Sequence, residues 1–216
     1  MSEPSLPEQI ANELRRDILR GTLVPGAPLK ERDRALEMGV SRTPMREAIR
    51  ILSQEGLVVL RPARSPLVAD PPLSDIMDHV IVLRALEELS GELACTNATE
   101  EDLDKLRAIN AKFESEFYTA DRLVSFETDM SFHMAIARAS HNNALADTHR
   151  SFLARLWRAR FLTSTRRRNR QTVLEQHAAL LDALCRRDRA ALKTAFDAHL
   201  GHLADDIRKV FEKEQT

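Results

Sequence analysis

The sequence predicts a mainly α-helical protein, with a winged helix-turn-helix over residues 1–70 and an all-helical bundle of about six helices over residues 71–216. All nine prolines lie at or before Pro72, and only two of the six glycines follow it. A long proline-free segment rich in Ala, Leu, Arg and Glu favours stacked helices. Aromatic residues are 5% of the chain, which argues against a β-sandwich or barrel. Asp70-Pro71-Pro72 is therefore the expected linker between two domains.

Three helices are predicted in the first domain. Apolar residues recur every four positions from Ile10 to Ile18, which indicates an amphipathic helix over 7–20. A short helix is expected over 31–38, where a glycine follows. The third helix is expected to begin at Thr43-Pro44, with the threonine as N-cap and the proline at the first helical position.

A β-hairpin is predicted after the third helix. Residues 57–60 are apolar and partly β-branched, and residues 67–69 can return antiparallel after a turn over 61–66. Two helices separated by a tight glycine turn and followed by a hairpin form a winged helix-turn-helix.

The second domain is expected to contain helices over 73–96, 100–118, 121–140, 142–163, 170–187 and 188–213. Thr99 stands three residues before Asp102, which predicts a capping box at the start of the second of these helices. The basic run Arg166–Arg170 between two helices is interpreted as a solvated loop, with contact to DNA phosphate as the alternative.

Composition excludes several classes of protein. The chain has 32 basic and 33 acidic residues and a net charge of −1, which excludes a uniformly basic nucleic-acid coat but not a local basic patch. Cys95 and Cys185 are too few for a disulfide framework and indicate a reducing compartment. The sequence has no apolar run of about 18 residues and no signal peptide, so we expect a cytoplasmic, soluble protein without a membrane partner.

Polar and basic residues gather around the start of the third helix: Arg32, Ser41, Arg42, Thr43 and Arg46. Free N–H groups at a helix N-terminus bind phosphate, and arginines reach guanine edges in the major groove. Residues 29–66 carry eight basic and five acidic side chains, a modest positive excess. A solvated helical face is the alternative, but the order of turn, capped helix and hairpin favours a DNA-binding surface.

At these residues the sequence resembles the GntR family of bacterial transcription regulators, over residues 8–69. The segments that carry the resemblance are Ile18–Gly26, Glu31-Arg32, Gly39–Ala48 and Glu55–Leu57. The resemblance implies that Arg32, Arg42 and Arg46 contact operator DNA, with Ser41 and Thr43 on phosphates. The family usually has glycine at the wing tip, where Ser65 is expected here, which leaves Arg64 to enter the minor groove.

A second group of residues has the composition of a metal site. Asp129 and His133 are four residues apart, so they lie on one face of a helix. His177 and His199 lie on two later predicted helices, and helical bundles build metal sites from facing helices. The alternative is that these histidines form hydrogen bonds in the core. The other histidines are interpreted as structural: His79, His141, His149 and His202.

This Asp-x-x-x-His, His and His pattern is similar to that of the FCD-type (FadR/VanR-like) effector domain, over about 73–213. The resemblance implies a helical bundle that holds a divalent metal through Asp129, His133, His177 and His199, with a small carboxylate effector beside it. Zinc is the expected metal, with nickel or manganese as alternatives. Many relatives carry an arginine in the first bundle helix at a register that falls on Leu83 here, and Arg84 is one place off it. The candidate effector contacts are Arg84 and, as alternatives, Arg155 and Arg158 in the fourth helix, for which simple surface positions are the other interpretation.

Together these features predict a ligand-responsive transcription regulator that is not an enzyme. It is expected to bind a palindromic double-stranded operator as a homodimer, because two recognition helices on a two-fold axis read half-sites about one helical turn apart or a multiple of it. Two alternatives stay open: a metal-dependent hydrolase built on the bundle, and a repressor that senses the metal alone. The hydrolase has no convincing free general base and leaves the first domain unexplained.

Overall fold

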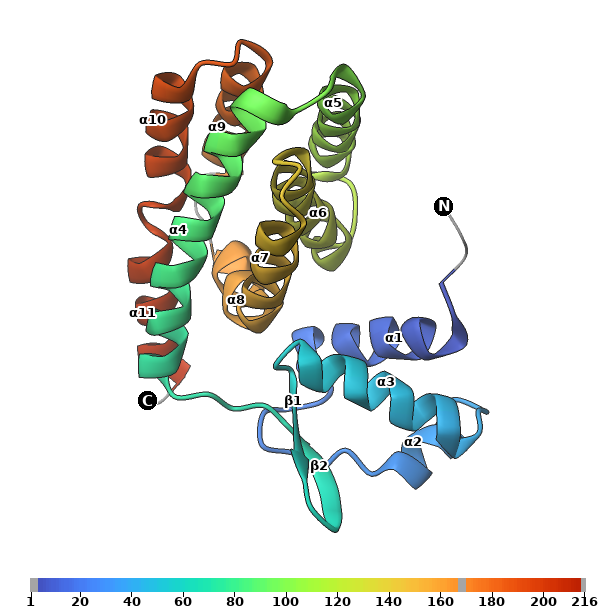
Figure 1. The fold of residues 1–216 in the computed structure, drawn as a ribbon. Coiled ribbons are helices and arrows are strands. Elements are labelled where there is room, and N and C mark those ends of the chain that lie inside the picture. The colour runs from blue at the N-terminus through green and yellow to red at the C-terminus, as the bar shows by residue number, and fades with distance from the viewer. Residues whose placement is uncertain (1–3, 167–169, 215–216) are drawn as a thin grey trace. The chain divides into compact units, whose positions relative to one another are not determined.

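The computed structural model describes residues 4–166 and 170–214, and the chain divides into two compact units, residues 1–72 and 73–216 (Figure 1). The centre of the basic run Arg166–Arg170 lies outside the described residues. None of the helices in the described part of the chain is long and apolar enough to cross a membrane.

The first unit is the predicted winged helix-turn-helix. Its elements are α1 (Leu6–Arg20), α2 (Glu31–Glu37), α3 (Arg42–Gln54), β1 (Val58–Arg61) and β2 (Arg64–Val68). A capping box between Ser5 and Glu8 starts α1. Gly21 ends this helix with a φ of +80°, a left-handed conformation that glycine adopts without strain.

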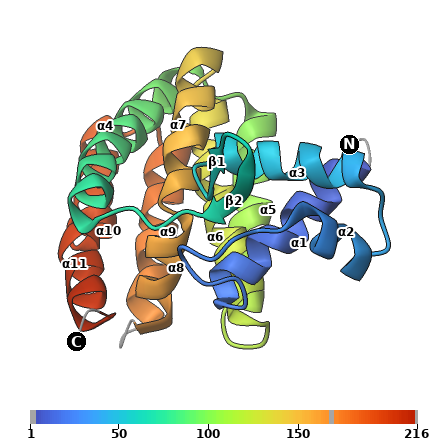
Figure 2. The same cartoon turned by 90° about the horizontal axis from the view of Figure 1, so that it is seen from below.

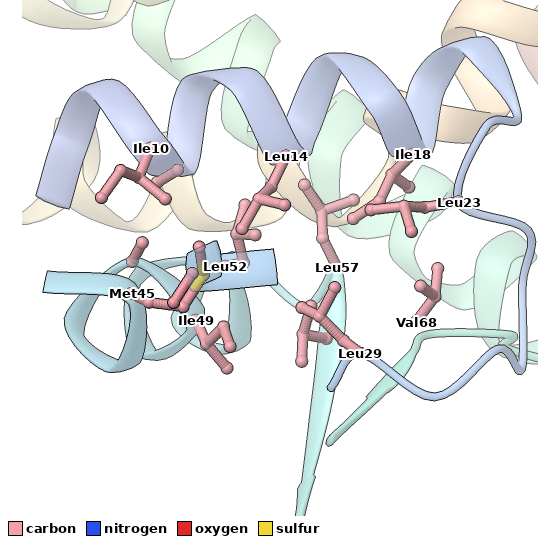
Figure 3. Packing of buried hydrophobic residues seen from close by; sticks show 14 residues of the cluster. Ile10, Leu14, Ile18, Leu23, Leu29, Met45, Ile49, Leu52, Leu57 and Val68 are labelled. Carbon is pink, nitrogen blue, oxygen red and sulfur yellow. The ribbon is translucent and has the colours of Figure 1, made fainter. Parts of the chain in front are cut away.

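The core of the first unit lies between α1 and α3 (Figure 3). The residues that meet there are Ile10, Leu14 and Ile18 of α1 and Met45, Ile49 and Leu52 of α3. All six are buried, so the predicted four-residue periodicity of α1 is confirmed. Burying one such side chain contributes about 1.5–3 kcal/mol to folding. This packing fixes α3 against α1 and leaves the N-terminal turn of α3 exposed.

The wing is a two-stranded antiparallel hairpin whose tip is the turn Pro62-Ala63. Arg61 pairs with Arg64 across this turn, so the prediction that Ser65 forms the tip is wrong. Ser65 lies inside β2, where its carbonyl oxygen accepts hydrogen bonds from the Arg61 guanidinium at 2.7 and 2.9 Å. Ala63 has a φ of +54°, a conformation that favours glycine, which fits a tip at this residue.

Eight helices occupy the described part of the second unit: α4 (Leu73–Asn97), α5 (Glu100–Glu116), α6 (Arg122–Ala139), α7 (Asn143–Arg155), α8 (Trp157–Arg166), α9 (Arg170–Cys185), α10 (Arg189–Leu200) and α11 (Leu203–Glu214). The all-helical prediction is confirmed, and so is the capping box of Thr99 and Asp102. Two predicted helices, 142–163 and 188–213, are each broken into two. The first break falls at the fully buried Leu156, whose backbone N–H donates to the carbonyl oxygen of Leu153, three residues earlier.

The long helix α4 packs against α6, α7 and α10 (Figures 1 and 2). Its buried residues recur every three or four positions, which turns one face of α4 to the other helices. Gly91 lies on this face, where α4 approaches α10 closely: a Cβ atom here would overlap the Phe196 ring and lie 2.9 Å from the Leu192 Cδ2 atom.

Gly91→Ala is expected to destabilise the protein by about 1–3 kcal/mol, because Phe196 is buried and the added methyl group overpacks the contact. Intrinsic helix propensity alone predicts the opposite sign, a gain of about 1 kcal/mol. Urea unfolding of the variant and the wild type measures the difference. A variant more stable than the wild type would show that α4 and α10 are not tightly packed at this glycine.

Candidate DNA interface and metal centre

The helix-turn-helix presents the predicted DNA-contacting residues on its surface. All six are exposed: Arg32 on α2, Ser41, Arg42, Thr43 and Arg46 at the start of α3, and Arg64 in the wing. Ser41 is the N-cap of α3, so the prediction that Thr43 caps this helix is wrong. Pro44 is the third residue of α3, where a missing N–H costs nothing because the first four N–H groups of a helix have no intrahelical partner.

The arginines of this surface differ in how they are held. Arg46 contacts α2 through its Nε atom, 3.2 Å from Oε2 of Glu31, and its side chain is 51% exposed. Within the described residues, Arg32, Arg42 and Arg64 form no ion pair. Their charges are therefore available to a phosphate or a base, while Arg46 is oriented by Glu31 beside them.

In the second unit the structure brings the four predicted metal ligands together. Asp129 and His133 come from α6, His177 from α9 and His199 from α10, and one potential ligand atom of each lies within 4.8 Å of those of the others. His177 Nε2 is 3.1 Å from Asp129 Oδ1, and His199 Nε2 is 3.2 Å from His133 Nε2. The three imidazoles are buried, so the cluster lies inside the bundle.

The environment of the cluster favours the protonation states that metal ligands need at three of the four residues. At His133 burial opposes the charged imidazole, but the Glu87 carboxylate beside it raises the pKa. Burial lowers the pKa of His177 and, more strongly, that of His199, because a charged imidazole loses its hydration. Burial opposes ionisation of Asp129 as well, but the adjacent imidazoles of His133 and His177 hold the pKa of this carboxyl well below its ordinary value. A neutral imidazole and an ionised carboxylate are the forms that coordinate a metal.

The side chains fit a divalent metal ion. Asp129 Oδ1 and both ring nitrogens of His177 are buried and have no hydrogen bond of good geometry within the described part of the chain. Buried polar atoms normally have a partner, and imidazole and carboxylate groups together suit divalent transition metals. The His177 ring stacks between the rings of Phe113 and Phe132, whose centroids lie 4.8 and 4.7 Å from the centroid of the imidazole. This packing holds the imidazole in its orientation toward Asp129.

Three buried residues around the cluster were not predicted from the sequence. Arg160 of α8 is 5% exposed, and its Nη2 atom lies 3.0 Å from Nε2 of His133. Glu87 of α4 contacts Nδ1 of His133 at 3.0 Å on the other side of that ring, and His149 of α7 contacts Glu87 at 3.1 Å. Arg160 follows Leu153 and Leu156 at helical spacing, so its position on the apolar face of the predicted helix 142–163 is the signal that could have found it.

A cavity of about 70 Å³ adjoins the cluster. Its polar lining consists of Arg122, Ser125, Asp129, Arg160, Thr163 and Ser164, and phenylalanines supply much of the apolar wall. Asp129 and Arg160 therefore belong both to the surroundings of the cluster and to the wall of the cavity.

The three arginines predicted to contact an effector do not line this cavity. Arg84 forms ion pairs with Glu88 and Asp197 at the surface, because the inward register of α4 falls on the buried Leu83. Arg155 is exposed, and Arg158 lies over the Phe211 ring, 5.6 Å from its centroid. The cationic group that the structure places at the cluster is that of Arg160 instead.

A helix-turn-helix with an exposed polar surface, followed in the chain by a helical domain, is the architecture of a DNA-binding transcription regulator. Residues 6–68 match the model of the bacterial regulatory proteins of the gntR family, and residues 80–202 match the FCD domain. The chain therefore belongs to the GntR family and carries an FCD domain.

Similar proteins agree with this assignment. The HTH-type transcriptional repressor RspR of Escherichia coli K12 is 28% identical over 94% of this chain and 89% of its own length. An HTH-type transcriptional regulator in an unstable DNA locus of Streptomyces ambofaciens is 30% identical, over 92% of this chain and 83% of its own. The structure of E. coli McbR/YncC has the same fold, with a TM-score of 0.77 at 22% identity, and covers 99% of this chain and all of that one.

The chain is thus a DNA-binding transcription regulator and not an enzyme. The hydrolase alternative is wrong, because both domains match regulator families and the relatives of the whole chain are transcription regulators.

Proposed function

We propose that this regulator binds a palindromic operator as a homodimer, and that a small carboxylate effector bound beside a divalent metal in the FCD domain changes its affinity for that operator. The observation that carries this proposal is the cavity wall shared by Asp129 and Arg160, a candidate metal ligand and a buried cation.

The charges inside the bundle support an anionic effector. Glu87 and Asp129 contribute two buried negative charges, and Arg160 contributes one positive charge. These three charges sum to −1. A divalent cation bound by neutral histidines would change the sum to +1. A buried charge is costly unless it is paired, so the site would favour a single carboxylate as counter-ion. The guanidinium of Arg160 offers two parallel N–H groups that match a carboxylate.

The proposed metal is zinc, held by Asp129, His133, His177 and His199, because imidazole and carboxylate groups suit zinc and its coordination geometry adapts to such ligands. Nickel and manganese are the alternatives, since a mixed nitrogen and oxygen site selects weakly among divalent ions. The bound ion would supply a Lewis acid for one carboxylate oxygen of the effector.

On DNA, we propose that Arg32, Arg42 and Arg46 contact bases in the major groove, with Ser41 and Thr43 on phosphates. Their exposure around the N-terminus of α3 supports these roles. Arg64, next to the wing tip, is proposed to enter the minor groove.

The test of the proposed function is operator binding with the metal and the carboxylate varied separately. A palindromic site selected from random DNA is titrated with zinc-loaded or chelator-treated protein, in the presence of a panel of small mono- and dicarboxylates. We expect a carboxylate to change the affinity for DNA only when the metal is bound. If zinc alone changes the affinity and no carboxylate does, the protein is a metal sensor and the effector proposal is wrong.

The protein is expected to be a dimer at micromolar concentration without DNA, because one winged helix buries too little surface for tight specific binding. Helix α4 supports this expectation, since it exposes the apolar side chains of Ile81, Val82 and Leu89. Sedimentation equilibrium measures the mass, and Leu89→Glu should shift it toward the monomer, whereas Leu89→Ile keeps the apolar surface and the dimer. A wild-type protein that sediments as a monomer and binds half-sites singly would contradict the homodimer.

A further inference from the structure

We propose that Glu87 is a positioning residue for the metal ligand His133, and that His149 holds Glu87 in place from the opposite side. The inference rests on the proposed function in one respect, since it takes His133 as a ligand. It adds a role for α4 and α7, two helices that contribute none of the four candidate ligands within the described residues.

Glu87 has no exposed surface, and its carboxylate lies between two imidazoles. Its Oε2 atom is 3.0 Å from Nδ1 of His133. Its Oε1 atom is 3.1 Å from Nε2 of His149 and 3.7 Å from Nη1 of Arg160, both contacts being ion pairs without hydrogen-bond geometry in the described structure. Both histidines are also fully buried. A buried carboxylate is strongly unfavourable unless it is paired, so these two rings and the guanidinium of Arg160 are the groups that compensate the charge of Glu87 in the core. The position of Glu87 and the direction of the His133 ring are therefore coupled.

The neighbours of His133 assign the proton on its ring. Nδ1 faces the Glu87 carboxylate, which only accepts hydrogen bonds when it is ionised. Nε2 faces Nη2 of Arg160 at 3.0 Å, and a guanidinium only donates; Nε2 of His199 lies 3.2 Å away and Oδ1 of Asp129 lies 3.4 Å away. The two shortest contacts, to Glu87 and to Arg160, are satisfied together when Nδ1–H donates to Glu87 and the Nε2 lone pair points toward the cluster. This is the tautomer that a metal ligand needs, and a carboxylate behind a ligating imidazole fixes both its tautomer and its orientation.

The arrangement connects the candidate metal centre to the first helix of the second unit. Glu87 lies in α4, which begins directly after the boundary between the two units and also carries the exposed Ile81 and Leu89. His133 lies in α6 and His149 in α7. A change in the His133 ring thus acts on α4 through one hydrogen bond.

The test compares Glu87→Gln with Glu88→Gln, which removes the same charge from the neighbouring, surface-exposed residue of α4. Zinc affinity is measured for full-length protein by competition with a chromophoric chelator. Loss of an outer-shell partner typically weakens metal binding about 10–100-fold, and we expect this loss for Glu87→Gln and none for Glu88→Gln. A folded Glu87→Gln variant with wild-type zinc affinity would overturn the positioning role.

A second readout uses protein without zinc. Nitrogen NMR of the histidine side chains should show His133 with its proton on Nδ1 in the wild type, and a loss of this preference in Glu87→Gln. A proton on Nε2 in the wild type would overturn the proposal even if zinc binds. Conversely, the wild-type protein could bind no divalent metal and still carry the His133 proton on Nδ1. This result would overturn the proposed function but leave the hydrogen bond between His133 and Glu87 in place.

Variants of His149 keep the test decisive if Glu87→Gln does not fold. His149→Gln retains an N–H donor for Glu87, whereas His149→Leu removes it. We expect zinc affinity close to that of the wild type for His149→Gln and a weaker affinity for His149→Leu. Equal zinc affinities of the two variants would show that His149 does not act through Glu87.

Discussion

His177→Ala is expected to remove most of the affinity for divalent metal and to abolish the response of operator binding to a carboxylate. His177 lies 3.1 Å from Asp129, and neither of its ring nitrogens has a hydrogen bond of good geometry in the described structure, so alanine removes a ligand without breaking another network. Loss of a ligand should exceed the roughly 10–100-fold effect of an outer-shell change. Chelator competition measures the metal, and fluorescence anisotropy on operator DNA measures the response.

Binding of operator DNA without effector should survive this substitution. The DNA-contacting candidates lie within residues 1–72, and the four candidate ligands all lie in the second unit. His202→Ala serves as the control, because His202 is exposed and does not belong to the cluster. If His177→Ala loses the metal but keeps a normal carboxylate response, the effector binds elsewhere in the FCD domain.

Arg46→Ala is expected to weaken specific operator binding by about 1–3 kcal/mol and to relax the base preference at one position of each half-site. Arg46 stands one turn beyond the start of α3, with its guanidinium half exposed and oriented by Glu31. Anisotropy titrations on the operator, on operators with single base changes and on random DNA separate these effects.

Arg50→Ala is the matched control for this experiment. Arg50 lies one turn further along α3, is similarly exposed and pairs with Glu47, so we expect a smaller change without altered base preference. Equal losses on operator and random DNA for Arg46→Ala would mean that Arg46 contacts only phosphate.

Much of the fold could be predicted from the sequence because its signals are local. The spacing of Ile10, Leu14 and Ile18 indicates a helix whatever packs against it, and Thr99 and Asp102 cap α5 through bonds three residues apart. The placement of Asp129 and His133 on one helix face follows from the same periodicity. Their function as ligands stays a prediction.

The tertiary structure alone decided which charged groups surround the cluster. Two partners of His133 are distant in the sequence: Glu87 precedes it by 46 residues, and Arg160 follows it by 27 residues. No local pattern encodes such pairs, because the residues of other helices that meet His133 depend on how the helices pack. Arg84, Arg155 and Arg158 do not line the cavity beside the cluster, and their role as effector contacts stays a prediction. Glu87 and Arg160 are buried against partners from other helices, and those partners exist only once the bundle is assembled.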